Sequence, residues 1–181
     1  MIPLPSQSPS LAALSSALDA ASHDARVAWM RGLGKREIVA LWALAEGHPV
    51  PLADLHAGEG DVVIHEGQNS LPLFNVFQKR VVRRGDVVQG YNHQFWSWFT
   101  GPGHFFVRGD GDAYFDYTSV PESAPAVFPP LAPNDGLVSQ FVYGGMIDRL
   151  RKICRHGLVG MAERGGKPTG DYFLLVRPPT A

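Results

Sequence analysis

Aromatic residues are concentrated in one short window of this sequence. Ten of its 19 Phe, Trp and Tyr residues lie within the 27 residues from Tyr91 to Tyr117. Runs of aromatic and β-branched residues alternate there with glycine-rich turns, which is typical of strands joined by hairpins. An extended segment with rings on both faces can bury one face in a core, but the other face must line a cavity or meet a partner. The window therefore predicts sheet structure together with a candidate binding site.

Glycine and proline mark the turns of the predicted sheet. The turn at residues 109–112 separates two aromatic runs and predicts a hairpin. Residues 165–170 separate the apolar runs 158–163 and 172–177, which predicts a second antiparallel pair. Residues 119–136 hold five prolines and predict a loop that crosses the surface.

Helices are predicted for the first quarter of the chain. Ile38, Leu41 and Trp42 recur at the spacing of one helical face, and Gly47 follows as a helix end. Residues 1–50 are therefore predicted to form a helical segment. We expect it to pack on an antiparallel-sheet body at residues 51–181, with one domain overall.

Two later segments have patterns that fit either a helix or a strand. In residues 71–84, Phe77, Arg80 and Val81 belong to a helical stripe, whereas the pair Val81-Val82 favours a strand; we predict a helix. Residues 145–155 carry apolar side chains at helical spacing and have the same ambiguity. Residues 138–143 are predicted to form a strand. The fold class that follows is α+β: N-terminal helices, then an antiparallel sheet of about five strands that can curl into a partial barrel, with one or two further helices.

Composition excludes several classes of protein. The net charge of −1 argues against a dedicated nucleic-acid binder, which usually has a strong basic excess. The single cysteine, Cys154, permits no internal disulfide. No apolar stretch is long enough for a transmembrane helix, and the first residues do not resemble a signal peptide. We expect a cytoplasmic protein, and the preference for Arg over Lys suggests a bacterial source.

Polar and basic residues near the aromatic window complete a candidate pocket. A mostly apolar cavity with a few convergent polar groups is the usual form of a small-molecule site. Two clusters of cations, at residues 79–84 and 149–155, hold about half of the positive charge and suit an anionic group. The predicted ligand-binding residues are Tyr91, Asn92, Trp96, Trp98, Phe106, Tyr117, Arg80 and Arg151.

Three further residues are candidates for catalysis. His93 and His104 flank the turn at residues 101–103, so that a hairpin could bring them together, with Asp116 orienting one imidazole. Such a pair suits general acid–base chemistry near neutral pH. The same three side chains could instead form a metal site with two histidines and one carboxylate, although we predict no metal and no cofactor.

Three functional hypotheses follow from these features. The first is a protein that binds a small, partly apolar ligand, whose polar end can be an anion, in an aromatic-lined pocket. The second is a cofactor-independent enzyme that uses the His/Asp pair in the same pocket. The third is a subunit that binds another protein, or a second copy of itself, without a small ligand. No catalytic fingerprint chooses among them, and no specific contact with nucleic acid is predicted.

Overall fold

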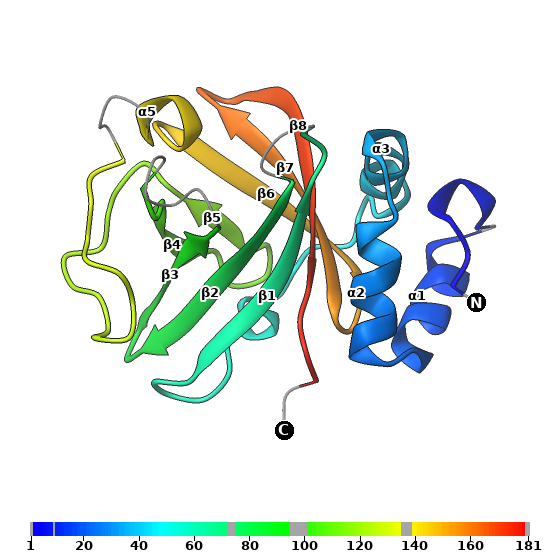
Figure 1. Ribbon diagram of the computed structural model, residues 1–181, viewed down its shortest axis with the longest axis horizontal. Helices are drawn as coiled ribbons and strands as arrows, with labels where there is room; N and C mark the ends of the chain where they lie inside the picture. Colours follow the sequence, from blue (N-terminus) through cyan, green and yellow to red (C-terminus); the bar gives the residue numbers. More distant parts are fainter. Residues whose placement is uncertain (1, 9, 72–74, 95–100, 135–138, 180–181) are drawn as a thin grey trace.

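The chain folds into a closed β-barrel with helices packed on its outer surface (Figure 1). The computed structural model describes residues 2–8, 10–71, 75–94, 101–134 and 139–179. Three helices precede the sheet, as predicted, and within the described residues a short helix also follows β5. The helical elements are η1 (Pro5–Gln7), α1 (Leu11–Ala20), α2 (His23–Arg31), α3 (Lys35–Leu44), η2 (Leu52–Asp54) and α5 (Ser139–Val142).

Every strand of the barrel is antiparallel to the next one in the sequence, and the last strand pairs with the first. The prediction of an α+β fold with an antiparallel sheet is therefore confirmed. The predicted count of about five strands is wrong, because the sheet has eight strands and closes completely. The strands are β1 (Val62–Asn69), β2 (Val76–Arg84), β3 (Val87–His93), β4 (His104–Arg108), β5 (Tyr114–Asp116), β6 (Met146–Cys154), β7 (Gly157–Arg164) and β8 (Lys167–Val176).

Two of the additional strands, β2 and β6, are segments in which the apolar residues have helical spacing. In β2 the side chains of Phe77, Lys79 and Val81 face the interior of the barrel, and in β6 those of Asp148 and Leu150 do so. A charged residue occupies an interior position in each strand. This charge interrupts the two-residue alternation of apolar side chains by which a strand is recognised. The apolar residues that remain therefore fit the spacing of a helix better than that of a strand.

Other local predictions had mixed outcomes. The hairpin at residues 109–112 is confirmed as the connection of β4 and β5. The antiparallel pair predicted around residues 165–170 is confirmed as β7 and β8, but its turn is only residues 165–166, because residues 167–170 already belong to β8. The predicted strand at 138–143 is wrong, because Ser139–Val142 form α5.

Glycines make room for aromatic rings inside the barrel. Each of three interior Phe residues stands directly opposite a glycine on the neighbouring strand. A Cβ atom at Gly67 would lie 2.6 Å from Phe77, so only glycine accommodates the ring at that separation. The three pairs are Gly67 with Phe77, Gly90 with Phe105 and Gly160 with Phe173.

One end of the barrel is closed by the segment that leads into β1. Val50 and Leu55 belong to the interior core, and the backbone of residues 48–52 bonds to Lys152, Asp110 and Ala113. Apolar side chains fill the interior next to this segment. Because β6 runs from α5 at its start to a hydrogen bond with His48 near its end, α5 lies at the opposite end of the barrel, as Figure 1 also shows.

The three N-terminal helices cover the outer face of four adjacent strands, β6, β7, β8 and β1 (Figure 1). Their buried side chains form a second core with the outward-facing residues of those strands, such as Ile153, Leu174 and Val176. Arg31 on α2 also forms an ion pair with Glu66 on β1, at 3.2 Å. Cys154 lies in this second core, where burial raises the pKa of its thiol to about 11, so the thiol is unreactive near neutral pH.

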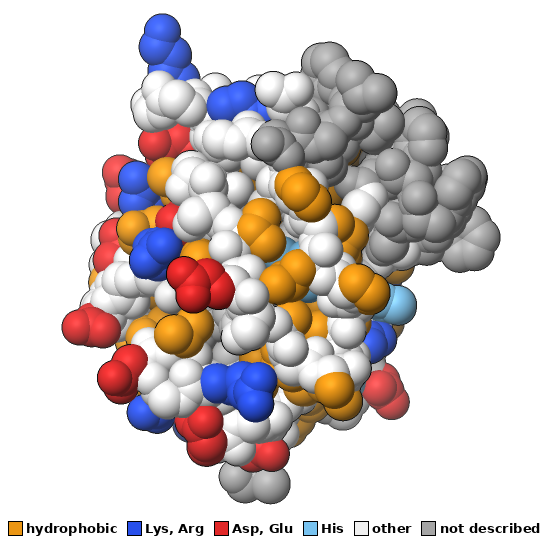
Figure 2. All heavy atoms as spheres, turned by 90° about the vertical axis from the view of Figure 1, so that its left-hand side faces the viewer, with side chains coloured by type: hydrophobic (Ala, Val, Ile, Leu, Met, Phe, Trp, Pro, Cys, Tyr) orange, Lys and Arg blue, Asp and Glu red, His pale blue; other side chains and the backbone are white. Residues whose placement is uncertain are grey.

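The proline-rich loop crosses the outside of the barrel, as predicted. Phe128 from this loop packs against Tyr91 on β3, with ring centroids 4.7 Å apart. Apolar side chains are visible across this side of the molecule (Figure 2), and Val127 in the loop is 72% exposed. Among the residues described, no helix is long and apolar enough to cross a membrane.

The glycine–aromatic pairs generate a test. In Gly160→Ala the new Cβ would overlap the ring of Phe173, so overpacking is expected to lower the free energy of unfolding by about 1–3 kcal/mol. Gly111→Ala is the matched control, because a Cβ there meets nothing within 4 Å and is expected to cost less than about 0.5 kcal/mol. Urea unfolding of both variants measures the difference. Equal stabilities would contradict the steric role of Gly160.

A candidate binding cavity in the barrel

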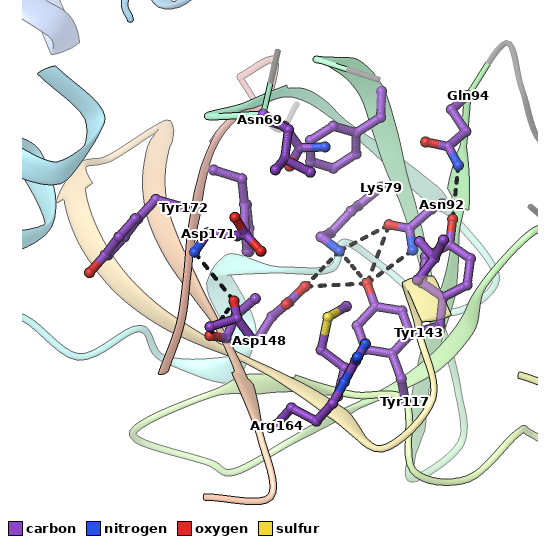
Figure 3. Close-up of a pocket in the computed structure, with 17 residues that line it drawn as sticks. Asn69, Lys79, Asn92, Gln94, Tyr117, Tyr143, Asp148, Arg164, Asp171 and Tyr172 are labelled. Carbon is purple, nitrogen blue, oxygen red and sulfur yellow. Dashed lines mark hydrogen bonds and ion pairs between the residues drawn. The ribbon is translucent and has the colours of Figure 1, made fainter. Parts of the chain in front are cut away.

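The half of the barrel nearer α5 contains a cavity of about 410 Å³ (Figure 3). Its deep lining is buried, whereas Leu71, Val142, Arg164 and Thr169 at its margin are exposed. The cavity therefore has a buried floor and a mouth at the end of the barrel. Its lining residues are Asn69, Leu71, Phe77, Lys79, Asn92, Gln94, Tyr117, Val142, Tyr143, Met146, Asp148, Ala162, Arg164, Thr169, Asp171, Tyr172 and Phe173.

The floor of the cavity is a buried ion pair with two polar partners, called here the floor network. Lys79 on β2 donates to Asp148 Oδ2 on β6, at 3.0 Å, and both side chains are only 3% exposed. The Lys79 ammonium also donates to Asn92 Oδ1 at 2.9 Å and to the hydroxyl of Tyr117. These four side chains point toward one another (Figure 3). All three N–H groups of the ammonium therefore have acceptors.

Tyr117 and Asn92 complete the floor network. The Tyr117 hydroxyl lies 3.3 Å from Asp148 Oδ2, to which it can donate, and it accepts from Asn92 Nδ2 at 3.0 Å. Asn92 Nδ2 also donates to the carbonyl of Gly103 at 3.3 Å. The network thus joins β2, β3, β6 and the residue that follows β5.

Aromatic rings surround the charged end of Lys79. The ammonium lies 4.6–5.5 Å from the centroids of four Phe rings, a distance at which the negative face of a ring attracts a cation, and it contacts a fifth ring, that of Tyr117, through the hydroxyl. These contacts partly replace the water that the ammonium loses on burial. The rings belong to Phe77, Phe105, Phe115, Tyr117 and Phe173.

Burial disfavours the charged form of each member of this network. Desolvation lowers the pKa of Lys79, and the neighbouring Asp148 carboxylate partly restores it. Desolvation likewise raises the pKa of Asp148, with a partial offset from Lys79. The pKa of Tyr117 is raised well above its usual value, first by burial and then by Asp148. Tyr117 is therefore a neutral hydroxyl.

The structure brings two of the predicted ligand-binding residues, Asn92 and Tyr117, to the cavity. Tyr91 and Phe106 lie on the outside of the barrel, because they alternate with the inward-facing Asn92 and Phe105. Trp96 and Trp98 lie outside the described residues.

The three predicted catalytic residues face away from the cavity. His104 Nε2 lies 3.3 Å from the carbonyl of Pro130 in the surface loop, and Asp116 forms a 2.6 Å ion pair with Arg108. His93 lies beside Tyr91 on the outer surface of β3. Among the described contacts, none joins either histidine to Asp116. The geometry thus gives no support to an acid–base pair built from these residues.

Asp116 and His104 have environments that fit structural roles. Burial acts to raise the pKa of Asp116, but hydrogen bonds from Thr118 and Arg108 outweigh it and hold that pKa below its usual range. Burial lowers the pKa of His104. For the alternative metal reading, the described part of the chain contains no group of three or more His, Cys, Asp or Glu side chains placed to hold an ion.

The two predicted anion-binding arginines also lie outside the barrel. Arg80 donates to Gln78 on the same strand and to the hydroxyl of Tyr91. Arg151 stacks on Trp42 of α3 at 3.9 Å and donates to its carbonyl. Both cation clusters lie on strands, the first on β2 and the second on β6 and the residue that follows it.

Sequence reasoning missed the two charged residues at the cavity floor. A local signal for them exists, since Lys79 lies two residues from Phe77 and from Val81, and Asp148 lies two residues from Leu150. A charge flanked in this way by apolar residues marks an interior position of a strand. The signal could be used only if both segments had first been assigned as strands.

No protein family, no curated protein and no solved structure matches the chain. The geometry of the cavity is therefore the basis on which a function can be proposed.

The barrel interior also contains a buried histidine, which predicts a pH dependence of stability. His65 on β1 lies 3.0 Å from the carbonyl of Leu55, and burial lowers its pKa from 6.5 to about 4. In the pH window between these values the unfolded state binds a proton at His65 that the folded state does not bind. Stability must therefore fall as the pH falls through this window, by about 3 kcal/mol in total.

Urea unfolding at several pH values between about 7 and 4 measures this loss. His65→Gln is expected to remove most of it, because glutamine can still donate to Leu55 but does not titrate. His48→Gln, at an exposed histidine, is the control and is expected to leave the loss intact. An unchanged pH profile in His65→Gln would contradict the assignment to His65.

The buried ion pair predicts strong coupling between its two partners. Lys79→Met leaves the Asp148 carboxylate buried without a counter-charge and is expected to cost about 3–5 kcal/mol of unfolding free energy. The double variant Lys79→Met/Asp148→Leu is expected to regain most of that loss. Arg149→Met is the control, because Arg149 is 42% exposed in its pair with Glu163 and should cost at most about 1 kcal/mol. Equal costs for the two single variants would contradict the prediction.

Proposed function

We propose that this barrel binds one small, partly apolar molecule in its interior cavity. The observation that carries the proposal is unfilled space of about 410 Å³, which lies within the roughly 300–1,000 Å³ of small-molecule sites. Eight strands make a barrel that is either filled by its own side chains or wide enough for one small ligand. Here the half beside Val50 and Leu55 is filled, whereas the half toward α5 is not.

The lining supports a ligand that is mostly apolar with a polar end. Phe77, Met146 and Phe173 offer apolar contact area, and the floor network offers polar groups held in fixed positions by mutual hydrogen bonds. Fixed polar groups in a buried floor orient a ligand, and apolar walls supply most of its affinity.

The charges of the described lining do not favour an anion. Lys79 and Arg164 are balanced by Asp148 and Asp171. The positive charge of Lys79 is already compensated within 3.0 Å by a carboxylate. The anionic end that sequence reasoning allowed depended on Arg80 and Arg151, both of which face outward. We therefore propose a ligand without a required negative charge.

Binding of another protein or of a second copy of the chain stays a prediction, as do the bacterial source and the cytoplasmic location. Among the described residues, no contact favours a protein partner or a second copy of the chain over the cavity as the functional site.

A variant that fills the cavity tests the proposal. Ala162 lines the cavity and stands opposite Asp148 in the pairing of β6 and β7. In Ala162→Phe the ring would occupy the space of the ligand, so binding of N-phenyl-1-naphthylamine is expected to weaken at least about tenfold, a loss of about 1.4 kcal/mol. The fluorescence increase of this neutral probe measures the binding.

Ala13→Phe is the control variant, because Ala13 is exposed on α1, outside the barrel. It is expected to bind the probe like the wild-type protein, and circular dichroism verifies that both variants fold. The proposal fails if the wild-type protein does not bind the probe, or if Ala162→Phe binds it as tightly as Ala13→Phe does.

A further inference from the structure

We propose that Asp171 binds a protonated amine, so that the cavity selects an apolar ligand with an ammonium group over an alcohol or a carboxylate with the same apolar body. The inference rests on the proposed function, because it names the ligand class of the same cavity. It is carried by the position of one carboxylate on the cavity wall and by the absence of a partner for it among the described residues.

Asp171 is an interior residue of β8. Side chains alternate between the two faces of a strand, and Phe173, two residues further on, belongs to the interior core. Tyr172 between them packs outward against Trp42 of α3. Figure 3 shows the Asp171 side chain directed toward the cavity and Tyr172 directed away from it. The carboxylate therefore lines the cavity and not the outer surface of the barrel.

The Asp171 carboxylate is accessible to a ligand. Asp171 is half-buried, and its backbone N–H donates to Thr169 Oγ1 at 3.3 Å. Within the part of the chain that the structure describes, no hydrogen bond or ion pair reaches its two carboxylate oxygens. Neither oxygen is enclosed, because the buried oxygens that lack a partner include one of Asp148 but none of Asp171. A group inside the cavity can therefore contact this carboxylate directly.

The wall beside this carboxylate leaves room for a ligand. Ala162 on β7 stands next to residues 169–171 of β8, and its methyl group occupies little of the cavity. Asp148 follows on the other side of Ala162, but its charge is compensated by Lys79 at 3.0 Å. Among the described residues, Asp171 is thus the carboxylate of the cavity lining that still lacks a counter-charge.

Arg164 is the other charged residue on this side of the cavity, and its position limits its effect on a ligand. It is exposed at the margin, next to the turn at residues 165–166. Water strongly weakens the field of a charge in such a place, whereas the field of the half-buried Asp171 is weakened less. A cation inside the cavity is therefore attracted by Asp171 more than it is repelled by Arg164.

The chemistry of the wall distinguishes an ammonium from other polar groups. A hydrogen bond between a charged donor and a charged acceptor is stronger than one from a neutral hydroxyl. A ligand carboxylate would be repelled by Asp171 instead. Phe77 and Phe173 supply apolar contact area, and the faces of their rings attract cations. An organic cation therefore makes favourable contacts with both parts of the wall.

Three naphthalenes with the same apolar body and different polar groups test the inference. The probes are 1-naphthylmethylamine, 1-naphthalenemethanol and 1-naphthylacetate, each measured near neutral pH by competition with N-phenyl-1-naphthylamine. In the wild-type protein the amine is expected to bind about fivefold or more tightly than the alcohol. The carboxylate is expected to bind more weakly than the alcohol.

Asp171→Asn should remove this preference, because the amide has the same size and carries no charge. The amine and the alcohol are then expected to bind within about twofold of each other. Asp112→Asn is the matched control, because it removes the same charge from an exposed position in the hairpin of β4 and β5, away from the cavity. It is expected to keep the wild-type order.

Arg164→Gln tests the opposite assignment, in which the mouth holds an anion. We expect this variant to bind the amine at least as tightly as the wild-type protein does. The inference is overturned if the carboxylate binds the wild-type protein more tightly than the amine does, or if Arg164→Gln weakens binding of the amine.

The outcomes separate the two proposals. If N-phenyl-1-naphthylamine and all three naphthalenes fail to bind the wild-type protein, the proposed function fails. If they bind and Ala162→Phe blocks them, but the amine does not exceed the alcohol, only the present inference is overturned. An unchanged preference in folded Asp171→Asn also overturns it. Should Asp171→Asn not fold, the order of the probes in the wild-type protein and in Arg164→Gln still decides.

Discussion

The buried ion pair between Lys79 and Asp148 is the interaction on which the interior of this barrel depends. It joins β2 and β6, which are four strands apart in a ring of eight and therefore lie on opposite sides of the barrel. A charge in such a place is tolerated only with a counter-charge and saturated hydrogen bonds. Asn92, Tyr117 and four Phe rings supply the remaining partners of the ammonium. The pair also divides the interior into an apolar half and a half that holds the cavity.

The close fit of aromatic rings and glycines explains how the barrel accommodates the buried ion pair and the rings around it. A barrel of eight strands has little interior width, and large side chains on every strand would not fit. The alternation of Phe with Gly on neighbouring strands lets the rings of Phe77, Phe105 and Phe173 lie flat against backbone. Those same rings face the ammonium of Lys79, so the glycines indirectly support its burial.

The two halves of the barrel interior differ in how completely side chains fill them. One end of the barrel is closed by residues 48–55 and packed, and the opposite half keeps about 410 Å³ of space above a rigid polar floor. The floor is saturated in donors and leaves one carboxylate oxygen, Asp148 Oδ1, without a partner in the described residues. A protein that only needed a stable barrel would gain by filling that space with apolar side chains. The unfilled cavity is therefore the feature that supports the proposed binding of a small molecule.

The sequence by itself determined the local elements that depend on near neighbours. The N-terminal helices, the hairpin at residues 109–112, the antiparallel pair around residues 165–170 and the proline-rich loop were predictable, because apolar periodicity and turn residues specify them within a few positions. Of the candidate site, Asn92 and Tyr117 could be predicted from the aromatic window. The face of the sheet on which the other candidate residues lie could not be predicted, because a shift of one residue along a strand moves every side chain to the opposite face.

Only the tertiary structure decided that residues 76–84 and 146–154 are strands and that the sheet closes. Each of them carries one partner of an ion pair whose members are 69 positions apart, and a charge looks like a surface residue until its partner is known. Closure likewise depends on the pairing of β1 with β8, about a hundred residues away along the chain. A local sequence pattern cannot predict such contacts, because they contribute free energy only when distant segments already lie side by side.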